Sequence, residues 1–271
     1  YVVKVEDTLL NWLVTNVTTM SRNKLKDILA GQGIKVNGKI TTKYDYPLTP
    51  GMKIAISKTK RNNLFKSKYV DIVYEDNHII VVHKKAGIKA VLDDYLMRSK
   101  QKCNAHVVHR LDRDTSGLMV YAKDKRVERL FEEDWHNIVY DRRYMAVVSG
   151  EVHENEGTIA NWLKDNKMFV TYSCPFDNGG KYAVTHFHVI KRTAYHTLVE
   201  YKLETGRKNQ IRVHSADMGH PVCGDTKYGN GDDPIGRLCL HAYILAFYHP
   251  ITHKPLHFET PIPSDFKRIV K

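Results

Sequence analysis

The sequence predicts an α+β protein in which a small module precedes a larger domain. In the larger part, runs rich in β-branched residues alternate irregularly with helical patterns, which argues against strict βαβ repetition. Near the start, two helical patterns precede a hairpin and a strand. We therefore expect a small α/β domain over residues 1–58, a basic linker over 59–69, and a domain with a mixed, mostly antiparallel sheet over 70–271.

Two short helices open the first module. The first is expected after a cap at Asp7 or Thr8, and the second after Ser21. The second carries cations around its first turns and is expected to end near Gly31 and Gly33, because glycine can adopt the left-handed C-terminal conformation. The apolar residues at helical spacing are Leu9, Leu10, Leu13, Val14 and Val17 in the first helix and Leu25, Ile28 and Leu29 in the second.

A hairpin and a further strand complete the module. Asn37-Gly38 lies between alternating residues from Ile34 to Ile40, which is a strong hairpin signal. Pro50-Gly51 then turns the chain into a strand from Lys53 to Ser57. Residues 1–60 hold ten Lys and Arg against four acidic residues, half of the net charge of +12. This clustering favours RNA binding over a merely solvated basic face.

These features resemble the alpha-L RNA-binding module, also called S4-like. The resemblance rests on Ser21-Arg22-x-x-Leu25, Val36-Asn37-Gly38-Lys39 and Pro50-Gly51-Met52. It implies that the second helix and the hairpin clamp structured RNA through its phosphates and its shape. The RNA-binding side chains expected here are Arg22, Lys24, Lys26 and Lys39.

The larger domain is predicted to mix strands and helices. The strands are expected over residues 70–74, 78–83, 117–122, 144–148, 183–190 and 196–203. The helices are expected over residues 91–99, 125–136 and 210–218. A dinucleotide-binding or Walker fingerprint is absent from the sequence, so no nucleotide cofactor is expected.

Composition narrows the partner and the compartment. A net charge of +12 favours nucleic acid ahead of an anionic membrane surface. The longest strongly apolar stretch, Leu238 to Tyr248, is far shorter than the roughly 20 residues that a membrane-spanning helix needs. The four cysteines form no Cys-x-x-Cys pair, and the 15 histidines lack companions at ligand spacing, so we expect reduced thiols and no metal. No charged-then-apolar leader opens the chain, and we expect a cytoplasmic protein.

One loop combines a carboxylate, flanking cations and turn-forming residues just before a buried strand. It is His109-Arg110-Leu111-Asp112-Arg113-Asp114-Thr115-Ser116-Gly117. Asp112 lies between Arg110 and Arg113, and opposite charge within reach lowers the pKa of a carboxylate, so we expect Asp112 to be ionised. An ionised carboxylate can act as a nucleophile or a base. Taken alone, the loop is equally consistent with a surface turn, because Asp, Thr, Ser and Gly favour turns.

Four segments, in this order, resemble the RluA-type pseudouridine synthases. They are His109-Arg110-Leu111-Asp112 with Thr115-Ser116-Gly117, Tyr144-Met145-Ala146-Val147-Val148-x-Gly150, Thr205-Gly206-Arg207-x-x-Gln210-Ile211-Arg212, and Gly219-His220-Pro221-Val222-x-Gly224-Asp225-x-x-Tyr228. Glu75-Asp76-Asn77-His78 and Lys84-x-Ala86-Gly87 add an opening strand pair, so the resemblance spans essentially the whole chain. It implies an isomerase that breaks the C1′–N1 bond of a uridine in RNA and joins C1′ to C5, without a cofactor or a metal.

The resemblance also implies roles for single residues. Asp112 matches the catalytic aspartate, which either attacks the nucleotide or removes a ribose proton, and Arg212 matches the arginine that pairs with it. Tyr144 matches the tyrosine that packs on the target base. Arg110 matches the residue that fills the gap left by a flipped nucleotide. Arg207 precedes a predicted helix, where it could bind a phosphate or form a simple salt bridge.

The chain departs from the family at two places. Asn209 stands where the family usually has His, which would alter either RNA contacts or the support of Arg212. Lys85 stands where it has Pro, which restores a backbone donor. The alternative function is a non-catalytic RNA-binding or ribosome-assembly factor, but such a protein would be expected to have lost a site residue. The S4-like module favours large-subunit ribosomal RNA over transfer RNA as the substrate, and we expect a monomer.

Overall fold

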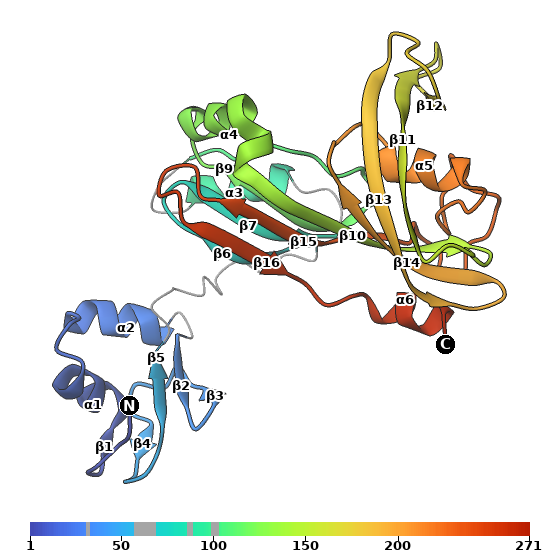
Figure 1. Ribbon diagram of the computed structural model, residues 1–271. Helices are drawn as coiled ribbons and strands as arrows, with labels where there is room; N and C mark the ends of the chain where they lie inside the picture. The colour runs from blue at the N-terminus through green and yellow to red at the C-terminus, as the bar shows by residue number, and fades with distance from the viewer. Residues whose placement is uncertain (31–32, 57–68, 86–88, 99–102) are drawn as a thin grey trace. The chain divides into compact units, whose positions relative to one another are not determined.

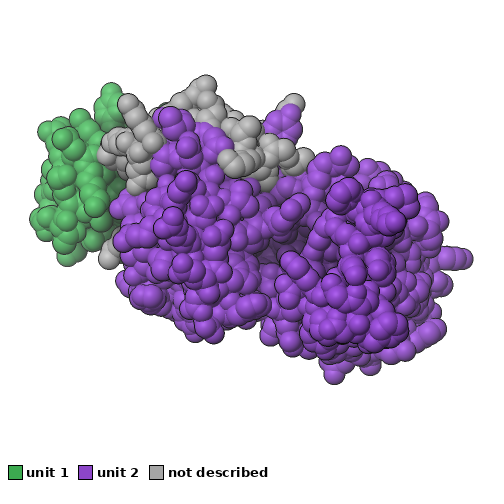
Figure 2. All heavy atoms as spheres, turned by 90° about the horizontal axis from the view of Figure 1, so that it is seen from above, with its two compact units in different colours: residues 1–66 green, residues 67–271 purple. Residues whose placement is uncertain are grey.

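The computed structural model describes residues 1–271 except 31–32, 57–68, 86–88 and 99–102 (Figure 1). The chain divides into two compact units, Tyr1–Lys66 and Ser67–Lys271, which Figure 2 draws in different colours. Most of the predicted linker, residues 59–68, lies outside the described part. In the described ranges, no helix has the length and apolar character needed to cross a membrane.

Unit 1 has the predicted order of helix, helix, hairpin and strand. The described elements are α1 (Leu9–Asn16), α2 (Arg22–Ala30), β2 (Ile34–Val36), β3 (Lys39–Ile40) and β5 (Ile54–Ile56), with a short pair formed by β1 (Asp7–Thr8) and β4 (Pro47–Leu48). In the larger sheet, β2 lies between β3 and β5. Both helices bury their apolar stripes in one core with the strands, including Leu9, Leu13, Leu25, Ile28, Ile34 and Ile54.

Local hydrogen bonds explain the turns of unit 1. The N–H of Lys24 donates to the Ser21 hydroxyl at 3.3 Å at the start of α2. Asn37 and Gly38 have φ angles of 48° and 81°, the left-handed conformations that a two-residue hairpin turn requires. The Asn37 side chain also accepts a hydrogen bond from the N–H of Lys53 at 2.8 Å, which ties the hairpin to the next strand.

Within the described part of unit 2, eleven strands form one sheet. They are β6 (Val70–Glu75), β7 (Ile79–Lys84), β8 (His106–Val107), β9 (Ser116–Ala122), β10 (Val139–Ser149), β11 (Glu156–Asp165), β12 (Thr171–Cys174), β13 (Lys181–Arg192), β14 (His196–Leu203), β15 (Leu240–Tyr248) and β16 (Pro255–Glu259). The main order is β12-β11-β13-β14-β10-β15-β9-β7-β6. Among these described strands every pairing is antiparallel except that of β9 with β15, so the predicted mixed, mostly antiparallel sheet is confirmed.

The helices of unit 2 pack against this sheet (Figure 1). They are α3 (Lys89–Arg98), α4 (Lys125–Ile138), α5 (Gln210–Asp217) and α6 (Ser264–Ile269). Asp124 caps α4, because its carboxylate accepts from the N–H of Val127 at 2.9 Å. Phe131 then anchors the helix in the core with β9 and β15.

Several elements escaped the sequence analysis. The apolar stretch that we tested only as a membrane span is the central strand β15, whose residues are almost all buried. Strands β11 and β16 were missed because they carry many exposed polar residues, and β12 because it has only four residues. Lys85 uses the backbone donor that proline would have removed, since its N–H donates to the carbonyl of Tyr69 at 2.7 Å beside the β6–β7 pair.

Candidate active site

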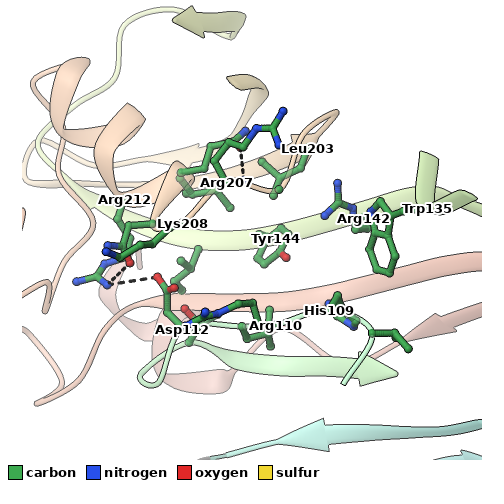
Figure 3. A pocket seen from close by; sticks show the side chains of 18 of the residues that line it. His109, Arg110, Asp112, Trp135, Arg142, Tyr144, Leu203, Arg207, Lys208 and Arg212 are labelled. Atoms are coloured by element: carbon green, nitrogen blue, oxygen red, sulfur yellow. Dashed lines mark hydrogen bonds and ion pairs between the residues drawn. The ribbon is translucent and has the colours of Figure 1, made fainter. Parts of the chain in front are cut away.

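A pocket of about 320 Å³ opens on one face of the unit 2 sheet. It is lined by the loop of residues 108–115, the end of α4, strand β10 and the segment 206–212. Figure 2 shows unit 2 hollowed near the middle of the face in view. Figure 3 shows Tyr144 in the middle of the pocket, with Asp112 and Arg212 at one end and Trp135 and Arg142 at the other.

Lys84 holds the loop 109–117, called here the Asp112 loop, in place through hydrogen bonds to its backbone. This buried lysine ends β7 and is only 6 % exposed. Its ammonium donates to the carbonyl oxygens of Asp112, Arg113 and Thr115 at 2.8, 2.7 and 2.8 Å. Three donors on one ammonium match three carbonyls, so Lys84 fixes the backbone from Asp112 to Thr115.

Both ends of the loop are fixed to the sheet. At the start, the His109 ring accepts from the N–H of Val120 at 3.1 Å, and burial together with nearby Arg142 lowers the pKa of His109 to about 3. At the end, Gly117 has a φ of 123° and lies against Ala242 of the parallel strand β15, so close that a Cβ would lie 2.2 Å from the Ala242 carbonyl oxygen. Only glycine fits at this position.

Arg212 connects Asp112 to a second, deeper carboxylate. Its Nη1 lies 3.3 Å from Asp112 Oδ2, and its Nε and Nη2 each donate to Asp225 at 2.7 Å. Asp225 is buried and also accepts from the N–H groups of Lys227 and Tyr228. Burial would lower the pKa of Arg212, but the Asp225 carboxylate holds it above its usual range. The guanidinium is therefore charged and fixed in direction by Asp225.

Asn209 supports the same guanidinium. It precedes α5 with a left-handed φ of 53°, its amide oxygen accepts from Arg212 Nη1 at 3.1 Å, and its amide nitrogen donates to the Tyr228 hydroxyl at 3.0 Å. Of the two consequences expected for Asn209, the structure shows the support of Arg212. Asparagine tolerates this backbone conformation better than most residues, which suits it to the position.

The charges around Asp112 differ from the sequence expectation. Arg113 turns away from Asp112 and pairs with Asp114, with Nε 3.0 Å from Oδ1. Arg110 is exposed at the edge of the pocket. Within the described part of the chain, neither neighbour in sequence forms an ion pair with Asp112. In a turn, adjacent side chains diverge, and the ion pair comes instead from Arg212, which is 100 residues away in sequence.

Tyr144 provides a flat, buried surface beside Asp112. It lies on β10, the strand between β14 and β15, and is 8 % exposed. Burial raises the pKa of Tyr144, opposed by the charge of Arg142, so its phenol is neutral near pH 7. A neutral phenol at this position can pack against a planar base and donate or accept a proton.

Similarity to known proteins identifies the family. The model described as RNA pseudouridylate synthase matches residues 78–217. The chain belongs to this family. It is therefore an isomerase that forms pseudouridine in RNA, and the RluA-type resemblance is confirmed.

Relatives with the same activity in their names align over nearly the whole chain. The uncharacterized RNA pseudouridine synthase YjbO of Bacillus subtilis is 34 % identical over 270 residues, covering 93 % of this chain and 95 % of its own. Ribosomal large subunit pseudouridine synthase D of Escherichia coli is 32 % identical over 281 residues, covering 93 % and 86 %. A solved structure of human RNA pseudouridylate synthase domain containing 1 is 27 % identical with a TM-score of 0.59, covering 72 % of this chain and 84 % of that one.

The remaining predicted RNA-binding residues of this family member lie in both units. In unit 1, Arg22, Lys24, Lys26 and Lys39 are all exposed. In unit 2, Arg207 lines the pocket and its Nε donates to the carbonyl of Tyr182 at 2.9 Å, so it is a backbone-anchored cation rather than half of a salt bridge.

Sequence reasoning gave no role to three residues that shape the pocket. Asp225 stood in a quoted motif, but its buried pairing with Arg212 has no local signature. Lys84 was noted only for its neighbour at 85, whereas its three carbonyl partners lie 28 to 31 residues away in sequence. Arg142 was left out because the strand was predicted from residue 144, although β10 begins at Val139. Two-residue spacing from Tyr144 would have placed Arg142 on the pocket face.

One group of metal-binding types lies apart from the pocket. In the described part of the chain, His196, Cys223 and Asp232 bring one ligand atom each within 4.8 Å of one another. Their polar atoms already pair, because Asp232 Oδ2 accepts from Ser149 at 2.6 Å and from Cys223 at 3.4 Å and lies 3.1 Å from His196 Nε2. Burial raises the pKa of the Cys223 thiol far above neutrality. These hydrogen bonds give the cluster a structural role, because they hold the loop before β15 in place.

Proposed function

We propose that Asp112 reacts with the target uridine, that Arg212 orients it and that Tyr144 packs on the base. The observation that carries this proposal is the 3.3 Å contact between Arg212 and Asp112 in the pocket that Tyr144 also lines. Among the described residues that line the pocket, Asp112 alone carries a carboxylate. An isomerase of this family needs one aspartate, and Asp112 is the candidate that the pocket offers.

The geometry around Asp112 suits a reacting carboxylate. Arg212 holds Oδ2, while Oδ1 makes no hydrogen bond to any residue that the structure describes. The free oxygen can reach the ribose, either to attack C1′ or to remove a ribose proton. Lys84 and Gly117 fix the backbone of the loop, so the carboxylate does not have to be ordered when RNA binds.

Tyr144 and Arg110 are placed to contact the flipped uridine and the gap that it leaves in the RNA. The neutral phenol of Tyr144 offers stacking that tolerates rotation of the uracil between N1 and C5 attachment. Arg110 is exposed at the pocket edge, where its long side chain can occupy the space vacated in the RNA. Flipping a nucleotide costs a few kcal/mol, and such an insertion offsets part of that cost.

We further propose large-subunit ribosomal RNA as the substrate, with the chain acting as a cytoplasmic monomer. Relatives that cover most of this chain are named for the large ribosomal subunit. Unit 1 supports a second grip on RNA, since it presents Arg22, Lys24, Lys26 and Lys39 on α2 and β3 as an S4-like module would. These cations would neutralise further phosphates of a structured RNA and add to its affinity.

Tritium release tests the proposal. Large-subunit ribosomal RNA labelled with tritium at C5 of uridine should lose label when the chain replaces the C5 hydrogen with C1′. Tyr144→Phe should retain RNA binding but slow release, while Tyr144→Leu should slow it further, because stacking is lost as well. Labelled transfer RNA provides the comparison, and release from transfer RNA alone would contradict the assigned substrate.

A further inference from the structure

Arg142 is a buried cation at the far end of the pocket. It lies two residues before Tyr144 on β10, so both side chains are on the same face of the sheet. Figure 3 places its guanidinium beside Trp135, across Tyr144 from Asp112. The residue is 9 % exposed, and the part that is exposed faces the pocket.

This guanidinium has no partner in the described part of the chain. It forms no hydrogen bond and no ion pair there, and its one ring contact is with Trp135, whose centroid lies 5.4 Å from Cζ. Its neighbour Arg143, on the opposite face of β10, shows the contrast, because it contacts Asp141 and Glu200 at 3.1 Å each. The pocket offers Arg142 no acid, since the single carboxylate in its lining, Asp112, is paired with Arg212.

A cation in this state is costly to the free protein. Burial lowers the pKa of Arg142, and the nearby Tyr144 acts in the opposite direction. A buried charge without a partner destabilises a fold, so an anion that arrives with a ligand would remove an existing penalty. The lining also holds Arg110, Arg207 and Lys208, so the pocket as a whole carries a large excess of positive charge.

Gly206 keeps the space around the guanidinium open. A Cβ at this position would lie 2.8 Å from Arg142 Nη1. The φ of Gly206 is not in the left-handed region, so backbone conformation does not require glycine here. The lack of a side chain at Gly206 therefore leaves room for the Arg142 guanidinium and for a ligand bound to it.

We infer that Arg142, supported by Trp135 and given room by Gly206, binds a backbone phosphate of the RNA strand next to the flipped uridine. The inference rests on the proposed function and adds a subsite to it. A phosphate is the one full anion that an RNA substrate carries, and a guanidinium fork matches two of its oxygens. Arg142 would thus pull the strand into the pocket while Asp112 acts at the other side of Tyr144.

Neutral linkages in the RNA test this inference without any need for turnover. The probe is a fragment of large-subunit ribosomal RNA carrying a uridine that the chain converts, with single methylphosphonate linkages placed in turn around that uridine. Binding is measured in an Asp112→Asn background. With Arg142 present, one of the neutral linkages should weaken RNA binding about tenfold, whereas the same linkage should have no effect on the Arg142→Gln variant. Arg142→Gln should also reduce the slope of log affinity against log salt concentration by about 0.7 to 0.9.

Matched variants separate the subsite from general effects. Arg143→Gln removes the neighbouring charge on the other face and should leave the linkage effect intact. Arg142→Lys retains the charge but loses the fork, so it should keep the linkage effect at a reduced affinity. This variant also keeps the test informative if Arg142→Gln unfolds. Gly206→Ala displaces the guanidinium without removing it and should weaken binding at the same linkage.

Two results would overturn the inference. Equal sensitivity to every neutral linkage with and without Arg142 would show that no phosphate is bound there. Loss of tritium release in Arg142→Gln with unchanged linkage sensitivity would show that Arg142 acts on the uracil instead. If the unaltered chain releases tritium from no RNA, the proposed function fails. The linkage measurement is then made at each linkage of the fragment that binds most tightly, so the two failures remain distinguishable.

Discussion

At the scale of the residue, a carboxylate that never meets the substrate sets the direction of Arg212. Asp225 receives two of the guanidinium nitrogens at 2.7 Å and is itself held by two backbone N–H groups. The third nitrogen is left to reach Asp112. Arg212 therefore acts as a rigid connector between a structural acid and the proposed reacting acid.

Replacing Asp225 should damage both stability and activity. Asp225→Asn leaves the Arg212 charge buried without its partner, which costs about 3 kcal/mol of unfolding free energy. Urea denaturation measures this loss, and tritium release should fall more than about tenfold as Arg212 loses its direction. The matched control is Asp165→Asn, which breaks the half-exposed pair with Lys208 and should cost less than about 1 kcal/mol. Equal losses for the two variants would contradict the connector role.

Lys84 should affect the rate of conversion more than RNA binding. Lys84→Met removes three hydrogen bonds to the backbone of the Asp112 loop while keeping the aliphatic packing. A displacement of the carboxylate by about 1 Å can slow a reaction about a hundredfold, so kcat should fall by one to two orders of magnitude. KM should change little, because Lys84 is buried beneath the loop. A rise in KM with kcat unchanged would mean that Lys84 contacts RNA instead.

The sequence predicted those site residues best that belong to short motifs. Asp112, Tyr144 and Arg212 were named from the chain alone, and the structure brings all three into one pocket. The supporting side chains were not predictable in the same way. The roles of Asp225 and Lys84 depend on partners that the fold brings together from distant parts of the chain. The role of Arg142 depends on its having no acidic partner among the described residues. No local sequence pattern indicates either situation.

At the scale of the element, the parallel contact between β9 and β15 fixes the position of the Asp112 loop. Gly117 pairs with Ala242, and the backbones approach too closely for any side chain at 117. The strand pattern of β9 was predicted, but β15 was not, because its continuous apolar run lacks the alternation of a half-buried strand. A strand buried on both faces is difficult to recognise from periodicity alone.

Gly117→Ala should therefore be far more damaging than an ordinary glycine substitution. The new methyl group would meet the Ala242 backbone and separate the strands, at a cost that we place at about 4 kcal/mol or more. Gly38→Ala is the comparison, since Gly38 also has a positive φ but open space around it, and should cost about 1 kcal/mol. Thermal or urea unfolding measures both. A similar small cost at the two positions would contradict the tight β9–β15 contact.

At the scale of the whole molecule, buried neutral histidines make stability depend on pH. Burial lowers the pKa of His214 to about 4 and those of His109 and His241 to about 3. The unfolded chain takes up protons at these residues near pH 6.5, whereas the folded chain excludes them. Stability is therefore full above this pH and is lost as the pH falls toward the folded pKa values.

The loss should be measurable well above the pH at which carboxylates titrate. From about pH 7.5 to about pH 5.5, the three histidines should lower the unfolding free energy by about 4 kcal/mol in total. Urea denaturation at both values checks this. His214→Gln should remove about a third of the pH-dependent loss, whatever its effect on stability at the higher pH. A flat profile for the unaltered chain would show that these imidazoles are accessible to protons in the folded state.

The two units differ in how much of their architecture could be predicted from the sequence. The order of elements in unit 1 was predicted because each turn there has its own signal, such as Asn37-Gly38. The sheet of unit 2 was predicted in class but not in topology. Its strand order joins segments far apart in the chain, as when β10 lies between β14 and β15. Such pairings depend on the packing of the whole domain.

The most direct test of the central claim compares two aspartates of one loop. Asp112→Asn keeps the shape of the side chain and removes the charge, so single-turnover tritium release should fall below detection while RNA affinity stays within about threefold. Asp114→Asn, two residues away on the exposed side of the loop, should retain most of the rate. Persistent release by Asp112→Asn would contradict the account.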